Sequence, residues 1–206
     1  MENWSAPFFD GVLALAALWG AMRFYGERAR PGMLFGAAAL FSVFLAAAFG
    51  TLRYAGLDAV AGINDGLSLI SAIVAPTWAI AAAIFIFRGG QDKARTGVLW
   101  IVPMAITALA FLPQTALLGE TYAQIAGLAM LCVLVGAGVL AAIKGRTWPG
   151  AALAISAAGY AFAALAMLGV FGATETAALN SFHIGIAIWA GAFAWGLPGA
   201  ARPHRV

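Results

Sequence analysis

The sequence has few charged residues, and this scarcity decides the class of protein. Asp, Glu, Lys and Arg make up 9% of the 206 residues, hydrophobic residues make up 64%, and the mean hydropathy is +0.94. Soluble domains are about a quarter charged and about half apolar. A water-soluble fold of this length has too little interior for so much apolar surface, so the sequence predicts an integral membrane protein.

Cysteine and lysine are almost absent, which excludes two kinds of site. The one cysteine, Cys132, lies inside an apolar run, so the chain forms no internal disulfide and no metal site built on thiolates alone. A retinal protein needs a lysine in its last helix for the Schiff base. The lysines, Lys93 and Lys144, both lie between apolar runs, so a retinal protein is excluded.

Histidine is equally scarce, and we expect no metal and no cofactor. The chain has 2 histidines, of which only His183 lies in an apolar run, because His204 belongs to the C-terminal tail. A catalytic zinc takes about three protein ligands, so a zinc site would have to combine His183 with Asp10 and Asp65. Bis-histidine haem ligation is excluded as well, because it needs two histidines within the spans.

The net charge of +3 and the pI of 9.4 do not indicate nucleic-acid binding. The basic residues are spread thinly over the segments between apolar runs, whereas nucleic-acid binding needs a clustered patch. We therefore expect the lipid bilayer, and no nucleic acid, as a partner. The sequence leaves the oligomeric state open.

Seven apolar runs follow one another along the chain. Each is close to the ~20 residues that a helix needs to cross a bilayer. They predict an all-α membrane protein, a seven-transmembrane-helix bundle that residues 1–206 form as a single domain. The turn at 117–122, between the fourth and fifth spans, is very short and could instead be a kink in one long helix. The expected spans are residues 8–25, 31–55, 66–87, 97–118, 122–143, 149–171 and 177–197.

Basic residues give the expected orientation. With seven spans, all 11 Lys and Arg residues except Arg53 fall on one side, in the loops after spans one, three and five and at the C-terminus. Cytoplasmic loops carry the excess of Lys and Arg. We expect an outside N-terminus and a cytoplasmic C-terminus, and the composition with its short loops favours a multi-pass protein of the bacterial inner membrane.

An R-x-x-P-G pattern opens both the second and the sixth expected span, at Arg28–Gly32 and Arg146–Gly150. This suits two three-helix units joined by the fourth helix, a 3+1+3 repeat of a kind that transporters use. The alternative is that arginine and an early proline recur because both are common at helix starts.

Pro76 and Pro103 fall inside the third and fourth expected spans. A proline within a helix frees a backbone carbonyl and kinks the helix. Such a kink either serves packing or shapes a site, and the sequence leaves both open.

Five polar residues in the outer half form the candidate ligand-binding site. Polar side chains within spans are costly and usually face the bundle interior. If the helices close into a ring in sequence order, the first lies between the second and the seventh, and these side chains converge. Arg53 needs a carboxylate or a ligand anion beside it, with Asp10 as the first candidate partner and Asp65 as the second. The five residues are Asp10, Arg53, Asp65, Asn180 and His183.

The preferred function is binding or transport of a small anionic or zwitterionic molecule or a lipid headgroup. Arg53 would hold the anion, while Asn180 and His183, three residues apart on one helix face, would orient the ligand. One alternative is a membrane-embedded hydrolase that uses His183 as base or metal ligand, so the sequence does not decide whether the chain is an enzyme. Another is an accessory subunit without a ligand, in which Asp10–Arg53 is a structural clamp.

Three of these features together resemble an uncharacterised family of small bacterial seven-helix membrane proteins. They are the aspartate that opens the first span, the Gly50-Thr51-Leu52-Arg53 end of the second, and the N-x-x-H of Asn180 and His183 in the seventh. The resemblance implies the same seven-helix fold. That family carries a histidine where Arg53 stands, so this chain departs from it at a position on which shared metal or acid–base chemistry would depend.

Overall fold

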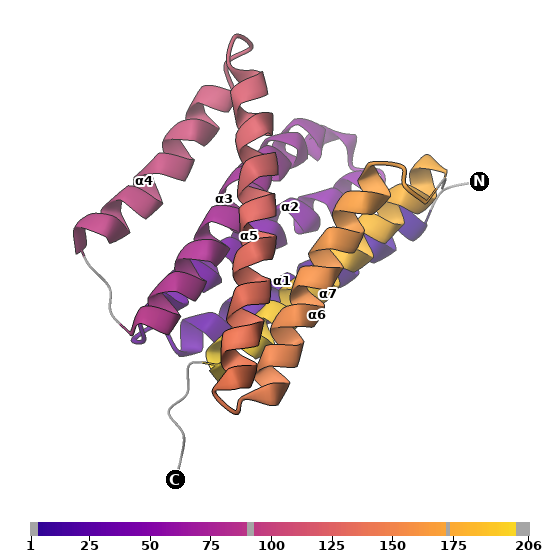
Figure 1. The fold of residues 1–206 in the computed structure, drawn as a ribbon. Helices are drawn as coiled ribbons and strands as arrows, with labels where there is room; N and C mark the ends of the chain where they lie inside the picture. Colours follow the sequence, from indigo (N-terminus) through magenta and orange to yellow (C-terminus); the bar gives the residue numbers. More distant parts are fainter. Residues whose placement is uncertain (1–3, 90–92, 172–173, 201–206) are drawn as a thin grey trace.

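The computed structural model describes residues 4–89, 93–171 and 174–200. Over these residues the chain forms seven α-helices and one short 3-10 turn and contains no strand (Figure 1). The predicted all-α fold with seven helices is confirmed. The elements are α1 (Ser5–Gly26), α2 (Met33–Tyr54), η1 (Asp58–Val60), α3 (Ala61–Arg88), α4 (Lys93–Ala110), α5 (Ala116–Ile143), α6 (Thr147–Met167) and α7 (Glu175–Ala200).

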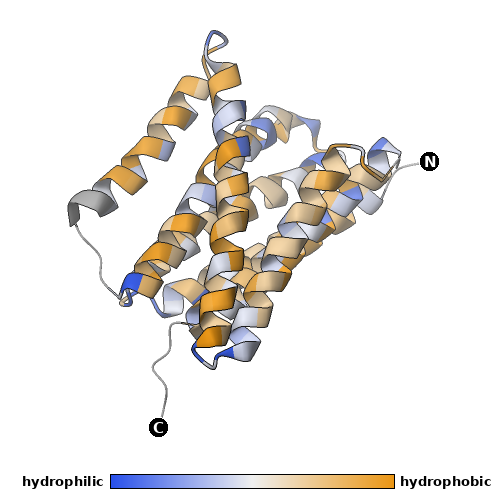
Figure 2. Cartoon of the chain, viewed as in Figure 1, coloured by the Kyte–Doolittle hydropathy of each residue, from blue (hydrophilic) through white to orange (hydrophobic). Residues whose placement is uncertain are grey.

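Among the described residues, six helices are long and apolar enough to cross a membrane, all except α4. The apolar part of α4, Thr96–Ala110, is shorter. Hydrophobic residues make up most of each helix and hydrophilic residues gather toward the helix ends (Figure 2). Many large hydrophobic side chains are exposed, such as Leu15, Ile101 and Leu128. Such a surface is expected of a multi-pass membrane protein, whose exposed faces contact acyl chains.

Six of the described helices close a ring. α1 packs between α2 and α7, α3 packs between α2 and α5, and α6 packs between α5 and α7. The ring therefore follows the sequence order with one exception, because α4 lies outside it against α3 and α5 (Figure 1). The neighbours expected for the first helix are confirmed, and they bring α1, α2, α3 and α7 together on one side of the interior.

The break between the fourth and fifth helices lies earlier than predicted. α4 ends at Ala110 and α5 begins at Ala116, so the turn is not at 117–122. Pro113 explains the difference, because proline disfavours helical geometry in the residue before it and donates no backbone hydrogen bond. The hydroxyl of Thr115 then donates to the carbonyl of Leu109 and closes the turn.

Helix α4 is held to α3 beside Pro103, where the sequence predicts a kink. Pro103 has no N–H to donate to the carbonyl of Leu99, four residues earlier. The indole Nε1 of Trp78 in α3 donates to this carbonyl at 3.1 Å. The ring of Trp100 stacks on Phe35 at 4.6 Å between centroids, so the packing reading of this kink is supported.

Small residues bring α5, α6 and α7 into close contact. A β carbon on Gly159 of α6 would lie 2.8 Å from the carbonyl oxygen of Gly185 in α7. A β carbon on Gly150 would lie 2.7 Å from the carbonyl oxygen of Gly138, where α5 and α6 meet near their shared loop. Membrane helices approach this closely where the interface lacks large side chains.

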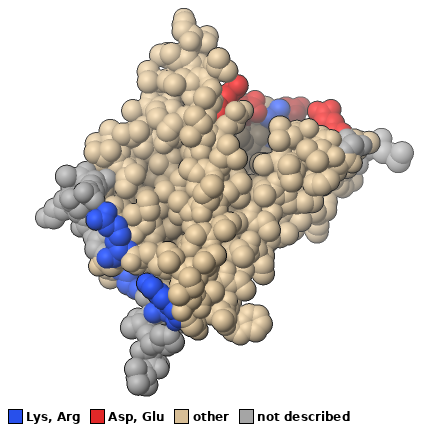
Figure 3. Space-filling view, viewed as in Figure 1, with Lys and Arg blue, Asp and Glu red and all other residues tan. Residues whose placement is uncertain are grey.

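Charged side chains divide between the two ends of the bundle (Figure 3). We call the end with the α1–α2 and α5–α6 loops the basic end, and the opposite end the acidic end. The basic end carries Arg23, Arg28, Arg30, Arg88, Lys144 and Arg146, and the acidic end carries Asp58, Asp65, Glu120 and Glu175 with Arg53. The predicted residues Lys93 and Arg95 lie where the side chains are not described, and Arg202, His204 and Arg205 lie outside the described residues.

Candidate functional site

Asp10 and His183 form a buried pair inside the ring. Asp10 lies on α1 and His183 on the neighbouring helix α7, and the Asp10 Oδ1 and His183 Nε2 atoms are 3.0 Å apart. The two residues are 3% and 6% exposed. Both residues were predicted for the site, and the structure brings them together as a buried carboxylate–imidazole pair.

The second oxygen of Asp10 lies over a glycine of α2. A β carbon on Gly50 would be 2.5 Å from Asp10 Oδ2 and 3.3 Å from Oδ1 of Asn64, which belongs to α3. The carboxylate and the amide oxygen therefore meet above a position where any larger residue would collide with them. Asn64 is 6% exposed, so residues of four helices build the polar cluster.

Asn64 is a residue that the sequence analysis left out of its site. The prediction began the third span at about residue 66 and expected Asn64 at the very start of that helix. In the structure α3 begins at Ala61, because the η1 turn leads directly into the helix. Asn64 thus lies in the first turns of α3 and faces inward.

Several buried polar atoms of this region have no hydrogen-bond partner within the described residues. They are Asp10 Oδ2, His183 Nδ1, Trp189 Nε1 and Asn180 Oδ1. Buried polar atoms in folded proteins are nearly always hydrogen-bonded. Three of the four belong to residues that line one cavity, so the cluster holds hydrogen-bonding capacity that the protein itself does not use.

That cavity has a volume of about 720 Å³ and lies inside the ring. Ligand pockets in proteins measure about 300–1,000 Å³. Most of its lining is apolar, with Leu13, Val43 and Ile186 among the lining residues. Its polar or hydrogen-bonding lining consists of Asp10, Tyr54, Asn64, Ser68, Ser71, Gln124, Tyr160, His183 and Trp189.

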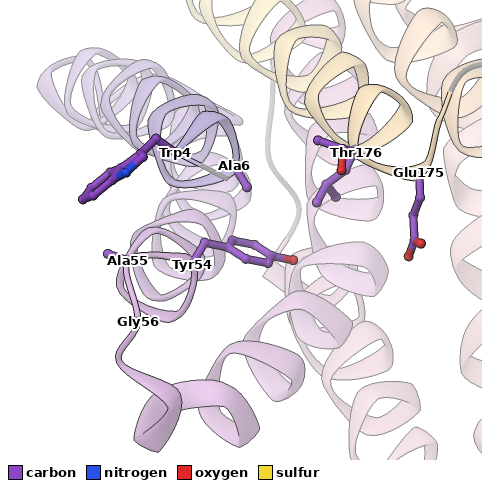
Figure 4. A pocket seen from close by; sticks show the side chains of 8 residues that line it. Trp4, Ala6, Tyr54, Ala55, Gly56, Glu175 and Thr176 are labelled. Carbon is purple, nitrogen blue, oxygen red and sulfur yellow. The ribbon is translucent and has the colours of Figure 1, made fainter. Parts of the chain in front are cut away.

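A second, smaller pocket lies at the acidic end (Figure 4). It measures about 470 Å³, and Tyr54 and Leu179 line both this pocket and the larger cavity. The ring of Tyr54 reaches from α2 toward Thr176 at the start of α7 (Figure 4). Tyr54 and Leu179 therefore lie where the outer pocket adjoins the cavity that holds the Asp10–His183 pair.

Arg53 does not pair with its first predicted partner. Its Nη1 lies 2.5 Å from Oδ1 of Asp65, the second candidate, and Asp10 pairs with His183 instead. The side chains of Arg53 and Asp65 are 33% and 66% exposed. Neither residue lines the larger cavity. Arg53 lies about one turn beyond Gly50, in the last turn of α2.

Asn180 is also outside the lining of the larger cavity. Its Nδ2 donates to the hydroxyl oxygen of Ser5 at 3.0 Å, which ties the start of α7 to the start of α1. The neighbouring residues Leu179, Phe182 and His183 do line the cavity. Of the five predicted site residues, the structure therefore brings Asp10 and His183 together and keeps Asn180, Arg53 and Asp65 at the edge.

The described residues contain no group of three or more His, Cys, Asp or Glu side chains placed to share a metal ion. In particular, Asp65 is engaged by Arg53 rather than by the Asp10–His183 pair. The three-residue zinc set that the sequence allowed is not assembled.

Comparisons with protein-family models, curated proteins and solved structures gave no match. The resemblance to small bacterial seven-helix proteins stays a prediction.

Proposed function

We propose that the protein binds a small amphiphilic molecule, such as a lipid-like compound, in the cavity inside the helix ring. The observation that carries this proposal is the coincidence of two features. The cavity has the volume of a ligand pocket, and polar atoms of its lining are buried without hydrogen-bond partners in the part of the chain that the structure describes. A ligand with a polar group and an apolar body matches this lining.

The expected role of Arg53 as the anchor of an anion is not part of this proposal. Arg53 is neutralised by Asp65 and lies outside the cavity lining. The polar group of the ligand would instead meet Asp10, Asn64 and His183. Asn180 would not contact the ligand; its hydrogen bond to Ser5 would instead fix how α7 lies beside α1.

The bilayer itself is the proposed source of the ligand. Leu128 of α5 and Met167 and Leu168 at the end of α6 line the cavity, yet they are 66%, 58% and 76% exposed. The cavity therefore reaches the surface between α5 and α6. These helices touch near their shared loop and separate toward the acidic end (Figure 1). A molecule dissolved in the membrane can enter by this side opening.

Probe binding with a cavity-filling variant tests the proposal. We expect the neutral fluorophore 1-aminoanthracene to bind the purified protein in lipid nanodiscs. Ala123 of α5 lines the cavity, so Ala123→Phe should lower the affinity at least tenfold. The matched control is Ala129→Phe, at an exposed position of the same helix, which should keep the affinity. Equal binding by both variants would refute a site in this cavity.

A membrane-embedded hydrolase is the second candidate, and the Asp10–His183 geometry favours it. A carboxylate that accepts a hydrogen bond from an imidazole orients the ring as a general base. The test is hydrolysis of an uncharged ester, such as p-nitrophenyl butyrate, by the wild-type protein and by His183→Gln. Hydrolysis by the wild-type protein that His183→Gln abolishes would support an enzyme. Probe binding without hydrolysis would refute the hydrolase and favour the binding protein.

We also propose that the basic end lies in the cytoplasm, with the N-terminus outside, in a bacterial inner membrane. This rests on the positive-inside bias and on the separation of charge in Figure 3. Single cysteines placed in a Cys132→Ala background test it: Asp58→Cys should react with an impermeant maleimide in intact spheroplasts, and Lys144→Cys should react only after lysis. The reverse pattern would invert the topology.

The 3+1+3 repeat also remains a proposal. The position of α4 outside the ring suits a helix that joins two units, α1–α3 and α5–α7.

A further inference from the structure

We propose that the cavity selects a ligand that carries an ammonium group, which the carboxylate of Asp10 receives together with Asn64. This inference rests on the proposed binding function and names the class of ligand. It follows from the charge of the lining, from the kind of hydrogen-bonding atoms that lack partners, and from the aromatic rings around them.

The charge of the lining favours a cation. Among the described residues that line the cavity, Asp10 is the only acidic residue and none is Lys or Arg. His183 is the only basic side chain there, and it already contacts the first oxygen of Asp10. A ligand carboxylate or phosphate would therefore approach a buried carboxylate without a cation to receive it, and this costs free energy. An ammonium group would approach a carboxylate whose second oxygen has no partner.

Around Gly50 and His183, the polar atoms that lack partners within the described residues are acceptors; the donor of the lining without a partner, Trp189 Nε1, belongs to a residue six positions farther along α7. Asp10 Oδ2 and Asn64 Oδ1 lie within 2.5 and 3.3 Å of one point above Gly50, so they converge. A neutral His183 that donates Nε2–H to Asp10 leaves a lone pair on Nδ1, which also lacks a partner. An ammonium group has up to three N–H donors and no acceptor, so its hydrogen-bonding pattern complements this cluster.

A backbone carbonyl that lacks its helical donor belongs to a residue of the cavity lining. Pro76 and Ala72 both line the cavity. Because proline lacks an N–H, the carbonyl of Ala72 loses its helical donor. The carbonyl freed by Pro103 receives a side-chain donor from the next helix, whereas no side chain within the described residues donates to Ala72. Pro76 thus leaves a carbonyl without its helical donor in a residue of the cavity lining.

Aromatic rings surround the same space. Tyr54, Tyr160, Phe182 and Trp189 line the cavity, and they come from α2, α6 and α7. The face of an aromatic ring attracts a cation and repels an anion. The rings also supply the apolar surface that the body of an amphiphile needs, so one cavity serves both parts of an alkylammonium ligand.

Three probes of equal chain length test the inference. Octylammonium, octanol and octanoate compete with 1-aminoanthracene for the full chain in phosphatidylcholine nanodiscs at pH 7.5, and Ala123→Phe corrects for partition into lipid. We expect octylammonium to displace the fluorophore at a concentration at least tenfold below that of octanoate, with octanol between them. Asp10→Asn should reduce this preference to less than threefold.

The control variant is Asp65→Asn, which removes a carboxylate outside the cavity and should keep the preference. Loss of the preference in this control would overturn the inference, since the effect would come from surface charge. If octanol binds and octanoate binds as tightly as octylammonium or more tightly, the ammonium class is overturned, while the proposed cavity binding stays intact. If no probe binds, both the proposed cavity binding and the ammonium class are refuted. If Asp10→Asn fails to fold, the ratio of the octanoate to the octylammonium concentration that displaces the fluorophore from the wild-type protein still tests the inference.

Discussion

The Nε of Arg23 on α1 donates a hydrogen bond to the carbonyl oxygen of Ala194 on α7, at 2.9 Å. Ala194 lies four residues before Pro198, which has no N–H to donate to it. An arginine at the end of one helix thus replaces the backbone donor that the proline removes from another. A second arginine, Arg146, donates to the carbonyl of Ala200 at the same end. The basic residues that give the expected orientation also close the end of α7.

The Arg23 hydrogen bond predicts a stability that depends on Pro198. Arg23→Met should lower the free energy of unfolding by about 1–3 kcal/mol, because it leaves a partly buried carbonyl without a donor. In a Pro198→Ala background the backbone N–H returns, and the same substitution should cost about 1 kcal/mol less. Thermal unfolding of the four proteins in detergent measures this coupling.

The control for Arg23 is Arg28→Met. Arg28 is exposed in the turn after α1 and donates to the carbonyl of Tyr25, three residues earlier, so its loss should change stability by less than about 0.5 kcal/mol. Equal costs of Arg23→Met in both backgrounds would show that the arginine does not act through the carbonyl freed by Pro198.

Much of the fold could be predicted from the sequence, because long apolar runs between charged segments leave few alternatives. The break near Pro113 was misplaced, since Leu117 and Leu118 continue the apolar pattern and only the proline signals the turn. The position of α4 outside the ring could not be predicted, because its composition resembles that of the other helices and only tertiary contacts exclude it.

The site was predictable only where a polar residue interrupts an apolar run. Asp10 and His183 were found in this way. The partner of Arg53 was not, because charge alone does not tell which of two nearby carboxylates lies on the same side of α2. Tyr160 and Trp189 gave no signal either, since an aromatic residue that faces a cavity looks, in sequence, like one that faces lipid.

Gly50 predicts a direct link between helix packing and the Asp10 carboxylate. Gly50→Ala places a β carbon 2.5 Å from Asp10 Oδ2, so Asp10 or α2 must move. We expect a loss of about 1–3 kcal/mol in stability and at least a tenfold weaker binding of octylammonium. The control is Gly136→Ala on α5, where a β carbon meets no atom within 4 Å. It should be neutral or stabilising. A Gly50→Ala protein that matches this control would mean that the carboxylate does not depend on the glycine.

The exposed pair of Arg53 and Asp65 predicts a small effect. Exposed ion pairs contribute about 0.2–1 kcal/mol, so Arg53→Ala should lower the free energy of unfolding by less than about 1 kcal/mol, as Arg88→Ala should. Probe affinity should stay within threefold of wild type, because Arg53 does not line the cavity. A cost above about 2 kcal/mol, or lost binding, would restore the anchoring role that sequence analysis gave to Arg53. Thermal unfolding and 1-aminoanthracene titration measure both.

The Asp10–His183 pair allows stability and function to be separated. His183→Leu removes one partner of a buried pair, and this should cost about 3–5 kcal/mol. Asp10→Leu combined with His183→Leu should recover most of that loss, because replacing a buried pair with apolar residues of similar size is often neutral or stabilising. Leucine branches at the same atom as aspartate, so Asp10→Leu keeps the shape of the side chain above Gly50, although its methyl groups are larger than the carboxylate oxygens.

The double variant should nevertheless lose the preference for octylammonium over octanoate, because the carboxylate that receives the ammonium group is gone. Thermal unfolding gives the stability of the wild-type, single and double variants, and the same competition experiment gives their preference. A double variant less stable than either single one would show that the pair is a clamp on which the bundle depends. A stable double variant that keeps the preference would remove Asp10 and His183 from the binding site, since no other acid within the described lining of the cavity could then supply the charge.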